Sequence, residues 1–185
     1  TGIGWIISQN PGNILLSARD EALVKKMVTS KIDPMIDSCG IRHLIRPNTM
    51  RAKSQRTGDT DFNKEFSGGS LMAVSVQNPS RMRQVSMKYG FIDDVEAGKN
   101  DKDAGSLDKL FETRFTAYHS KMKLFYISTP ETKQTSIIEP LYMRGDQRKF
   151  LIPCPCCGDF IELNWHMVNE NGDKSGITYK LDNHD

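Results

Sequence analysis

The sequence predicts an α/β fold in which helices flank a mainly parallel sheet, with a small β appendage near the C-terminus. Segments with strand-like and helix-like patterns alternate from Asn13 to Pro130. Two of the strand-like segments end in carboxylates or hydroxyls, and the pattern turns β-like around the cysteines between Arg148 and Trp165. The alternation indicates parallel strands, because each parallel pair needs a crossover of about a dozen residues or more, usually a helix.

The first part of the sequence predicts a strand, a long helix and a loop. Residues 1–8 have the pattern of the tail of a helix with no cap before it. A strand is expected at Asn13–Ala18, and a helix at Arg19–Ile36 with Asp20 as its N-cap. Arg42–Lys64 is polar and has no regular period, so we expect a long loop of the kind that usually carries function in a compact domain.

Basic residues gather in this expected loop. A run of charge often forms nothing more than a solvated face, and contact with phosphates is the alternative. The candidate phosphate-contacting residues are Arg42, Arg46, Arg51, Lys53 and Arg56.

The second part of the sequence continues the alternation. The turn Phe66–Ser70 leads into a strand at Leu71–Val76, which forms a small hairpin or an added strand. Helices are expected at Ser80–Met87 and at Ser106–Phe115, and each of them precedes an apolar strand.

The strands that follow these two helices end in groups suited to nucleotide chemistry. In a sheet that hydrolyses nucleotides, one acid at a strand end supports Mg²⁺ and a second acid orients the attacking water. A solvated turn after a buried strand would give the same pattern without function. We expect the two strand ends to share one edge of the sheet. The residues concerned are Asp93, Asp94 and Glu96 after the first strand, and Ser128, Thr129 and Pro130 after the second.

Three of the four cysteines lie in the segment 154–158, Cys-Pro-Cys-Cys-Gly. Cys154 and Cys157 have the C-x-x-C spacing that lets a tight turn direct two thiolates at one metal ion, and structural zinc requires four ligands. His166 or His184 could supply a third ligand. A reduced cysteine pair in a turn, without metal, is the competing interpretation, and isolated Cys39 fits a reducing compartment.

Length and composition fit one domain, or one domain with a small appendage, since the chain has 185 residues. No segment approaches the roughly 18–20 apolar residues of a membrane span, and no basic-then-apolar leader pattern is visible. The net charge of +2 is too small to indicate nucleic-acid binding by itself.

A phosphate-binding loop of the form G-x-x-x-x-G-K-[ST] does not occur in the sequence. Either the chain is no nucleotide hydrolase, or it starts after such a loop. The uncapped helical pattern of residues 1–8 favours the second interpretation.

Seven segments together resemble one protein family. Their order along the chain is similar to that of the lambda-type large terminase subunit, the DNA-packaging motor of tailed phages, and the resemblance extends roughly from Gly4 to Trp165. The segments are Asn10–Gly12, Phe66–Leu71, Phe91–Asp94, Arg114, Ser128–Pro130, Asp146–Arg148 and Cys154–Gly158.

This resemblance implies a P-loop NTPase-like fold with a zinc-knuckle-like appendage, and it implies ATP, Mg²⁺ and zinc as cofactors. Asp93 falls on the Mg²⁺-supporting acid of the family, and Asp94 stands where the family usually has a catalytic glutamate. Because Asp is shorter by one methylene, Glu96 is an alternative for that role. Arg114 matches a family arginine that could sense the γ-phosphate, with a structural ion pair as the alternative. Ser128, Thr129 and Pro130 match the motif that couples hydrolysis to movement.

The resemblance also divides the chain and implies partners. Residues 1–150 would form a partial ATPase domain without its phosphate-binding loop. Residues 151–185 would begin a zinc-knuckle and linker segment toward a nuclease domain outside this chain. The partners would be double-stranded viral DNA, the small terminase subunit, the portal protein and further copies in a ring, in the cytoplasm of the bacterial host and without a membrane.

We therefore expect this chain to hydrolyse no ATP by itself and to associate through an open strand edge at residues 124–128. Three other interpretations remain. The acids could hold the metal ions of a nuclease. The chain could be a non-catalytic module that binds DNA or a protein partner, or it could be a degenerate prophage remnant.

Overall fold

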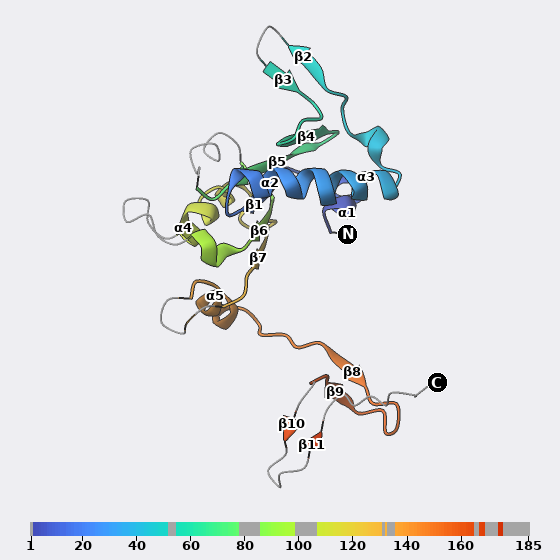
Figure 1. Cartoon of the computed structure of the whole chain (residues 1–185), viewed down its shortest axis with the longest axis vertical. Helices are drawn as coiled ribbons and strands as arrows, with labels where there is room; N and C mark the ends of the chain where they lie inside the picture. The colour runs from blue at the N-terminus through green and yellow to red at the C-terminus, as the bar shows by residue number, and fades with distance from the viewer. Residues whose placement is uncertain are drawn as a thin grey trace, which may run out of the picture. The chain divides into compact units, whose positions relative to one another are not determined.

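The computed structural model describes residues 2–51, 55–77, 86–98, 107–130, 132, 136–164, 167–168 and 174–175. The chain divides into two compact units, Thr1–Leu141 and Tyr142–Asp185. The first unit contains an α/β sheet and the second contains short hairpins (Figure 1).

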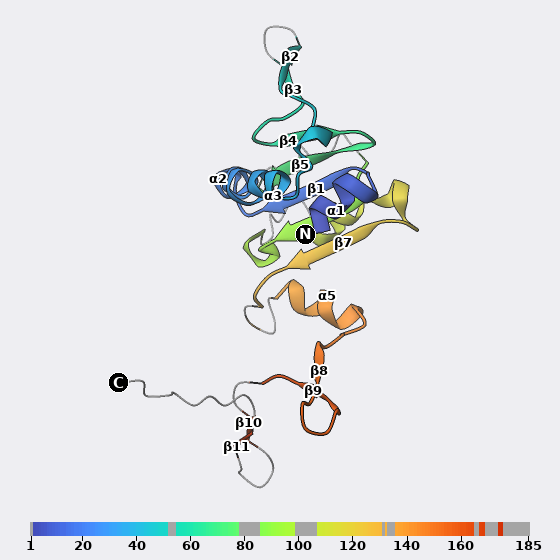
Figure 2. The same ribbon diagram turned by 90° about the vertical axis from the view of Figure 1, so that its right-hand side faces the viewer.

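A five-stranded sheet in the order β4-β5-β1-β6-β7 forms the centre of the first unit. Figure 2 shows the strands stacked in this order. β5, β1, β6 and β7 are parallel, and β4 is antiparallel to β5, so the expected mainly parallel sheet is confirmed. The strands are β1 (Ile14–Ala18), β4 (Asn63–Phe66), β5 (Gly69–Ser75), β6 (Tyr89–Asp93) and β7 (Lys123–Ile127).

Alternate residues of the strands point to opposite sides of the sheet, so the sheet has two apolar faces. Helices cover both faces. Ile14 and Leu16 of β1 belong to a core that includes residues of α1 (Gly2–Gln9), α2 (Glu21–Met27) and α3 (Asp33–Ser38). Leu15 lies in a second core with Phe111 of α4 (Leu107–Glu112) and Phe115, just before the 3₁₀ turn η5 (Thr116–Tyr118). Burial on both faces explains why the central strand β1, buried at every position, is an almost continuous apolar run.

The long helix expected at Arg19–Ile36 is present, but it is interrupted. Asp20 caps it as predicted, since its carboxylate accepts the N–H of Leu23 at 2.8 Å. Between α2 and α3 the chain forms a π-helical segment, η1 (Val28–Ile32). Pro34 lies two residues after the end of this segment and has no N–H to donate to the preceding turn, which accounts for the wider helix at this point.

The prediction of a long loop at Arg42–Lys64 is wrong in part. The segment begins with the 3₁₀ turn η2 (Arg42–Leu44), continues in a hairpin of β2 (Thr49–Arg51) and β3 (Gln55–Thr57), and reaches β4 at Asn63. The start of β4 escaped prediction because its inward position is Lys64, whose buried ammonium group replaces the apolar residue of an alternating pattern.

The remaining elements differ from the sequence prediction mainly in their bounds. α4 is shorter than the helix expected at Ser106–Phe115, and most of the helix expected at Ser80–Met87 lies outside the described residues. α5 (Ile138–Arg144) was not predicted. The second unit contains the β pattern expected around the cysteines, in β8 (Leu151–Pro153) and β9 (Phe160–Glu162). β10 (Met167–Val168) and β11 (Lys174–Ser175) lie beyond Trp165 and were not predicted. Among the helices described here, none has the length and apolar character needed to cross a membrane.

Candidate active site

The two strand ends that carry acids and hydroxyls lie side by side, as the sequence predicted. β6 and β7 are parallel neighbours, and Asp93 at the end of β6 pairs with Ile127 at the end of β7. Asp94 and Ser128 therefore follow directly at the same edge of the sheet. Asp93 and Asp94 are both half-buried, so each residue is partly accessible to a ligand.

Asp94 adopts a backbone conformation that is unusual for a residue with a side chain. Its φ angle is +59°, in the left-handed region, where Asp and Asn are enriched several-fold among non-glycine residues. Its N–H still donates to the carbonyl of Ile127 at 2.8 Å, so the chain turns away only after one further bond to β7. At Asp94 the backbone therefore leaves the path that a continuing strand would follow.

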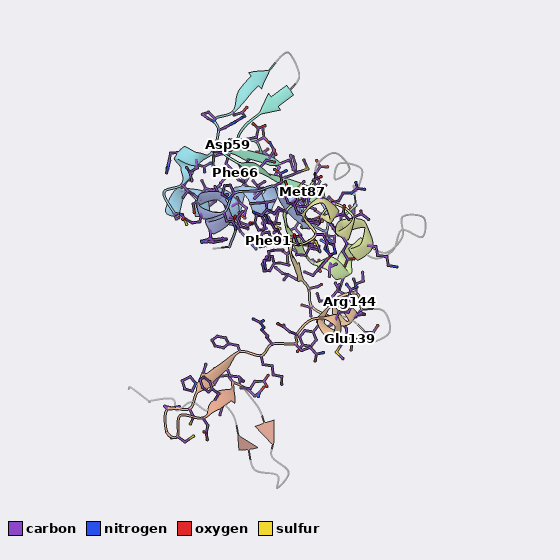
Figure 3. The ribbon with its side chains drawn as sticks, turned by 180° about the vertical axis from the view of Figure 1, so that it is seen from behind. Asp59, Phe66, Met87, Phe91, Glu139 and Arg144 are labelled. Atoms are coloured by element: carbon purple, nitrogen blue, oxygen red, sulfur yellow. The ribbon has the colours of Figure 1, made fainter. Side chains whose placement is uncertain are left out.

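Glu96 lies beyond this turn, in the 3₁₀ segment η4 (Val95–Gly98), and it is 3% exposed. Its Oε1 accepts the N–H groups of Ile137 at 2.8 Å and Ile138 at 3.0 Å, and the hydroxyl of Ser136 at 2.6 Å. These donors form the start of α5, which Glu139 and Arg144 mark in Figure 3. The carboxylate therefore caps a helix that follows about 40 residues later in the chain.

The three residues predicted to couple hydrolysis to movement follow β7. Ser128 joins the acids at this edge, since its Oγ accepts the backbone N–H of Glu96 at 3.3 Å. Thr129 and Pro130 continue the chain in an irregular, exposed conformation.

The backbone of Arg114 lies away from this edge. Its carbonyl oxygen accepts the N–H of Met87 at 3.0 Å, at the start of β6. Met87, labelled in Figure 3, precedes Asp93 by six positions, or about 20 Å of extended chain. The buried Nε of Arg114 has no hydrogen-bond partner within the part of the chain that the structure describes. The backbone of this arginine thus lies at the end of β6 opposite to the acids.

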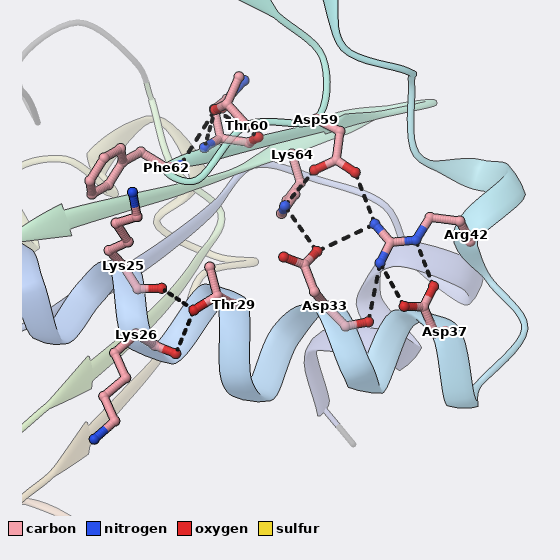
Figure 4. Close-up of polar contacts among 11 residues, drawn as sticks. Lys25, Lys26, Thr29, Asp33, Asp37, Arg42, Asp59, Thr60, Phe62 and Lys64 are labelled. Carbon is pink, nitrogen blue, oxygen red and sulfur yellow. Dashed lines mark hydrogen bonds and ion pairs between the residues drawn. The ribbon is translucent and has the colours of Figure 1, made fainter.

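Arg42, a candidate for phosphate contact, lies in an intramolecular ion network (Figure 4). Its Nε donates to Asp37 at 2.7 Å, and its Nη1 to Asp59 at 2.9 Å and to Asp33 at 3.3 Å. The hydrogen bond with Asp37 raises the pKa of Arg42 above its ordinary value and lowers the pKa of Asp37. Lys64 completes the network through Asp33 at 2.9 Å and through Asp59. The network ties α3 to β4, which gives Arg42 a structural role.

The other four candidates for phosphate contact follow Arg42 in the chain. Arg46 is exposed and forms an ion pair with Glu65 at 3.7 Å. In the β2–β3 hairpin, Arg51 is the cross-strand partner of Gln55, and Arg56 is that of Met50. The side chains of both arginines lie outside the part that the structure describes. Lys53 lies outside the described residues altogether.

The cysteine segment of the second unit forms the tight turn that its sequence predicted. Gly158, at φ +81°, donates its N–H to the carbonyl of Cys154 at 2.9 Å. The backbone N–H groups of Cys157 and Cys156 lower the pKa of the Cys154 thiol, which favours the thiolate that binds zinc. Among the described residues, no group of three His, Cys, Asp or Glu side chains forms a metal site. His166 and His184 lie outside them. The described residues thus contain the predicted tight turn but no zinc-knuckle site.

Sequence reasoning missed the part that Ser136 plays at this edge. Its hydroxyl accepts the N–H of Glu139 at 3.2 Å, while it also donates to Glu96. The segment Ser136-Ile137-Ile138-Glu139 has the S-x-x-E form of a capping box, and this signal could have revealed the start of α5.

Comparisons with known proteins agree with the fold and with the family resemblance. The sequence matches the family model for the phage terminase large subunit gpA, ATPase domain, over residues 1–181. No curated protein matches the sequence.

The solved structures similar to this chain include two phage large terminases. The ATPase domain of the Thermus phage P74-26 large terminase has a TM-score of 0.50 and 9% identity, over 85% of this chain and 63% of that one. The large terminase of a thermophilic bacteriophage has a TM-score of 0.46 and 15% identity, over 70% of this chain and 29% of that one. The first likeness shows the fold alone, and this chain spans less than two thirds of that domain's length.

Proposed function

The chain belongs to the family of phage terminase large subunit ATPase domains, and on this premise we propose that it forms the central part of an ATPase motor that packages viral DNA into procapsids. The observation that carries the proposal is the edge at which Asp93, Asp94 and Ser128 come together. Parallel α/β sheets bind their ligands at the carboxyl ends of the strands, which is where these residues lie.

We assign the chemistry of hydrolysis to the two neighbouring acids. Carboxylate oxygens are the protein ligands that Mg²⁺ prefers, and Asp93 ends a strand with its carboxylate half-buried. Mg²⁺ bound with ATP would supply charge neutralisation at the phosphates. We assign the orientation of the attacking water to Asp94, which follows Asp93 at the left-handed turn where the chain leaves β6. The shorter side chain suits this backbone, which explains Asp where the family usually has Glu.

The motor also needs a phosphate-binding loop, for which we propose a place beside β7. Within the described part of the chain, β7 pairs only with β6, so its other edge is open. Phe125 and Ile127 on this strand are 47% and 54% exposed, although Phe125 stacks on Phe91 at 4.8 Å between ring centroids. A further strand carrying the loop would pair with this edge and cover these side chains. Residues 1–150 would then be part of the ATPase domain.

The second unit has a proposed role of its own. We assign Cys154 and Cys157 to a zinc ion, with the remaining ligands supplied by residues outside those described. Residues 151–185 would lead toward a nuclease domain that cuts the packaged DNA.

The whole motor would act in the cytoplasm of the bacterial host, as a ring of copies. Its partners would be double-stranded viral DNA, the small terminase subunit and the portal protein. Of the basic residues predicted to contact DNA, Arg46, Arg51, Lys53 and Arg56 remain candidates, whereas Arg42 has its charge balanced by the network around it.

The test is ATP hydrolysis by the whole terminase subunit that contains this chain, with and without double-stranded DNA. We expect DNA-stimulated hydrolysis that falls by about 10²–10⁴-fold in Asp94→Asn, because the group that orients the water is lost. Asp61→Asn is the matched control, since Asp61 forms an exposed ion pair with Lys25 beside the opposite edge strand, and it should stay within about twofold of the parent. Hydrolysis that is indifferent to Asp94 would contradict its assignment. DNA cleavage that needs a metal ion but no nucleotide would favour a nuclease.

A further inference from the structure

The carboxylate of Glu96 connects the candidate active site to the first turn of α5. On the side of α5, Oε1 receives the N–H groups of Ile137 and Ile138 and the hydroxyl of Ser136. The N–H groups at the start of a helix have no partner within the helix, and they carry a partial positive charge that a carboxylate balances. A carboxylate that is 3% exposed and accepts three hydrogen bonds on one oxygen is held in a fixed place.

On the side of the active site, the backbone of the same short segment is bonded to the end of β7. The N–H of Glu96 donates to Ser128 Oγ, and the N–H of Asp94 donates to the carbonyl of Ile127. A displacement of the β7 end or of Ser128 therefore acts on Glu96, and through its carboxylate on α5.

α5 is also where the chain passes from one compact unit to the next. The boundary between the units falls between Leu141 and Tyr142, within this helix. The first turn of α5, which Glu96 caps, belongs to the first unit.

We propose that Glu96 is a positioning residue that links the hydrolysis site to α5, and that it does not act on the attacking water. This inference deepens the proposed function and rests on it for the reaction, although not for the contacts. In this proposal a movement of Ser128 displaces Glu96, and the displaced carboxylate of Glu96 moves the first turn of α5.

Amide hydrogen exchange of the 185-residue chain, resolved by NMR, tests the link. Glu96→Ala should speed exchange at Ile137 and Ile138 by about tenfold or more, because the acceptor of both amides is lost. Ser128→Ala touches neither amide, yet it should speed both by about threefold. In the Glu96→Ala background, Ser128→Ala should add nothing, since the connection is already broken. The amide of Leu15 in β1 serves as the control for global unfolding and should keep its exchange rate.

Two results would overturn the proposal: no effect of Ser128→Ala on Ile137 and Ile138, or an equal effect with and without Glu96. If Glu96→Ala does not fold, Glu96→Gln replaces it, because its amide oxygen can still accept. The Ser128→Ala effect must then persist in the Glu96→Gln background.

A kinetic readout separates positioning from direct catalysis in the whole subunit. Glu96→Gln should lower kcat by no more than about tenfold, because a neutral acceptor still caps α5. Removal of a general base typically costs about 10²–10⁴-fold, and a loss in that range would overturn the proposal. If the parent subunit hydrolyses no ATP, the proposed function fails, while the exchange rates still decide whether Glu96 links Ser128 to α5.

Discussion

The left-handed backbone of Asp94 predicts that Ala and Gly substitutions rank in opposite order at Asp93 and Asp94. At Asp94, with φ at +59°, a Cβ atom costs an ordinary L-residue about 1–2 kcal/mol that glycine avoids. Glycine loses about 0.4–1 kcal/mol of this advantage through the greater freedom of its unfolded chain. Asp94→Gly should therefore be more stable than Asp94→Ala by about 0.5–1 kcal/mol. Asp93 ends strand β6, where glycine is less favourable than alanine by roughly the same amount.

Urea unfolding of the four variants measures this reversal. Each Ala and Gly pair removes the same carboxylate, so the effect of the lost charge cancels within the pair. The difference between the two pairs should amount to about 1–2 kcal/mol in the free energy of unfolding. If alanine is the more stable residue at both positions by a similar margin, the backbone at Asp94 is not left-handed. Our explanation for Asp in place of the family's Glu would then fail.

Three further predictions concern the ion network, the cysteine turn and the open strand edge. Lys64→Met should destabilise the first unit by about 3 kcal/mol in chemical denaturation, because Lys64 is 3% exposed and its loss leaves Asp33 and Asp59 with only Arg42 of the network's two cations. Lys25→Met should change stability by less than about 1 kcal/mol, since the Lys25 ion pair is exposed. An equal cost for both would refute the structural role of the network. Cys154, whose pKa is held below its ordinary value, should be alkylated by iodoacetamide at lower pH in the folded chain than in urea, and coincident pH profiles would count against the turn. The 185-residue chain should self-associate in sedimentation and Phe125→Lys should reduce this, because lysine on a strand edge opposes pairing; a parent that stays monomeric at all concentrations would contradict the open edge.

The strands that form the centre of the sheet could be predicted from the sequence because both of their faces are buried. β1 is buried at every position, so its apolar run is continuous and unmistakable. β4 could not be predicted because its buried Lys64 depends on Asp33 and Asp59, which reach it only in the folded chain. A polar residue that is buried with distant partners hides the period of the strand that carries it.

The candidate active site could likewise be predicted only in part. The shared edge of Asp93 and Ser128 could be predicted, because neighbouring parallel strands end on the same side of a sheet. The cap that Glu96 provides could not, since α5 has no buried residue and its partner lies about 40 residues away. Arg114 was assigned to the site by family resemblance, whereas the hydrogen bond to Met87 puts its backbone at the other end of β6.

We propose that Asp93 supports Mg²⁺ and that Asp94 orients the attacking water, both at the end of β6. ATP binding and single-turnover hydrolysis, measured separately in the whole subunit, test this division of roles most directly. Asp94→Asn should bind ATP with an affinity within about threefold of the parent while hydrolysis falls by about 10²-fold or more, because only the orientation of water is lost. Asp93→Asn should weaken binding in the presence of Mg²⁺ and leave metal-free binding unchanged. If both variants lose binding equally, or if Asp94→Asn still hydrolyses ATP at the parent rate, the division of roles is contradicted.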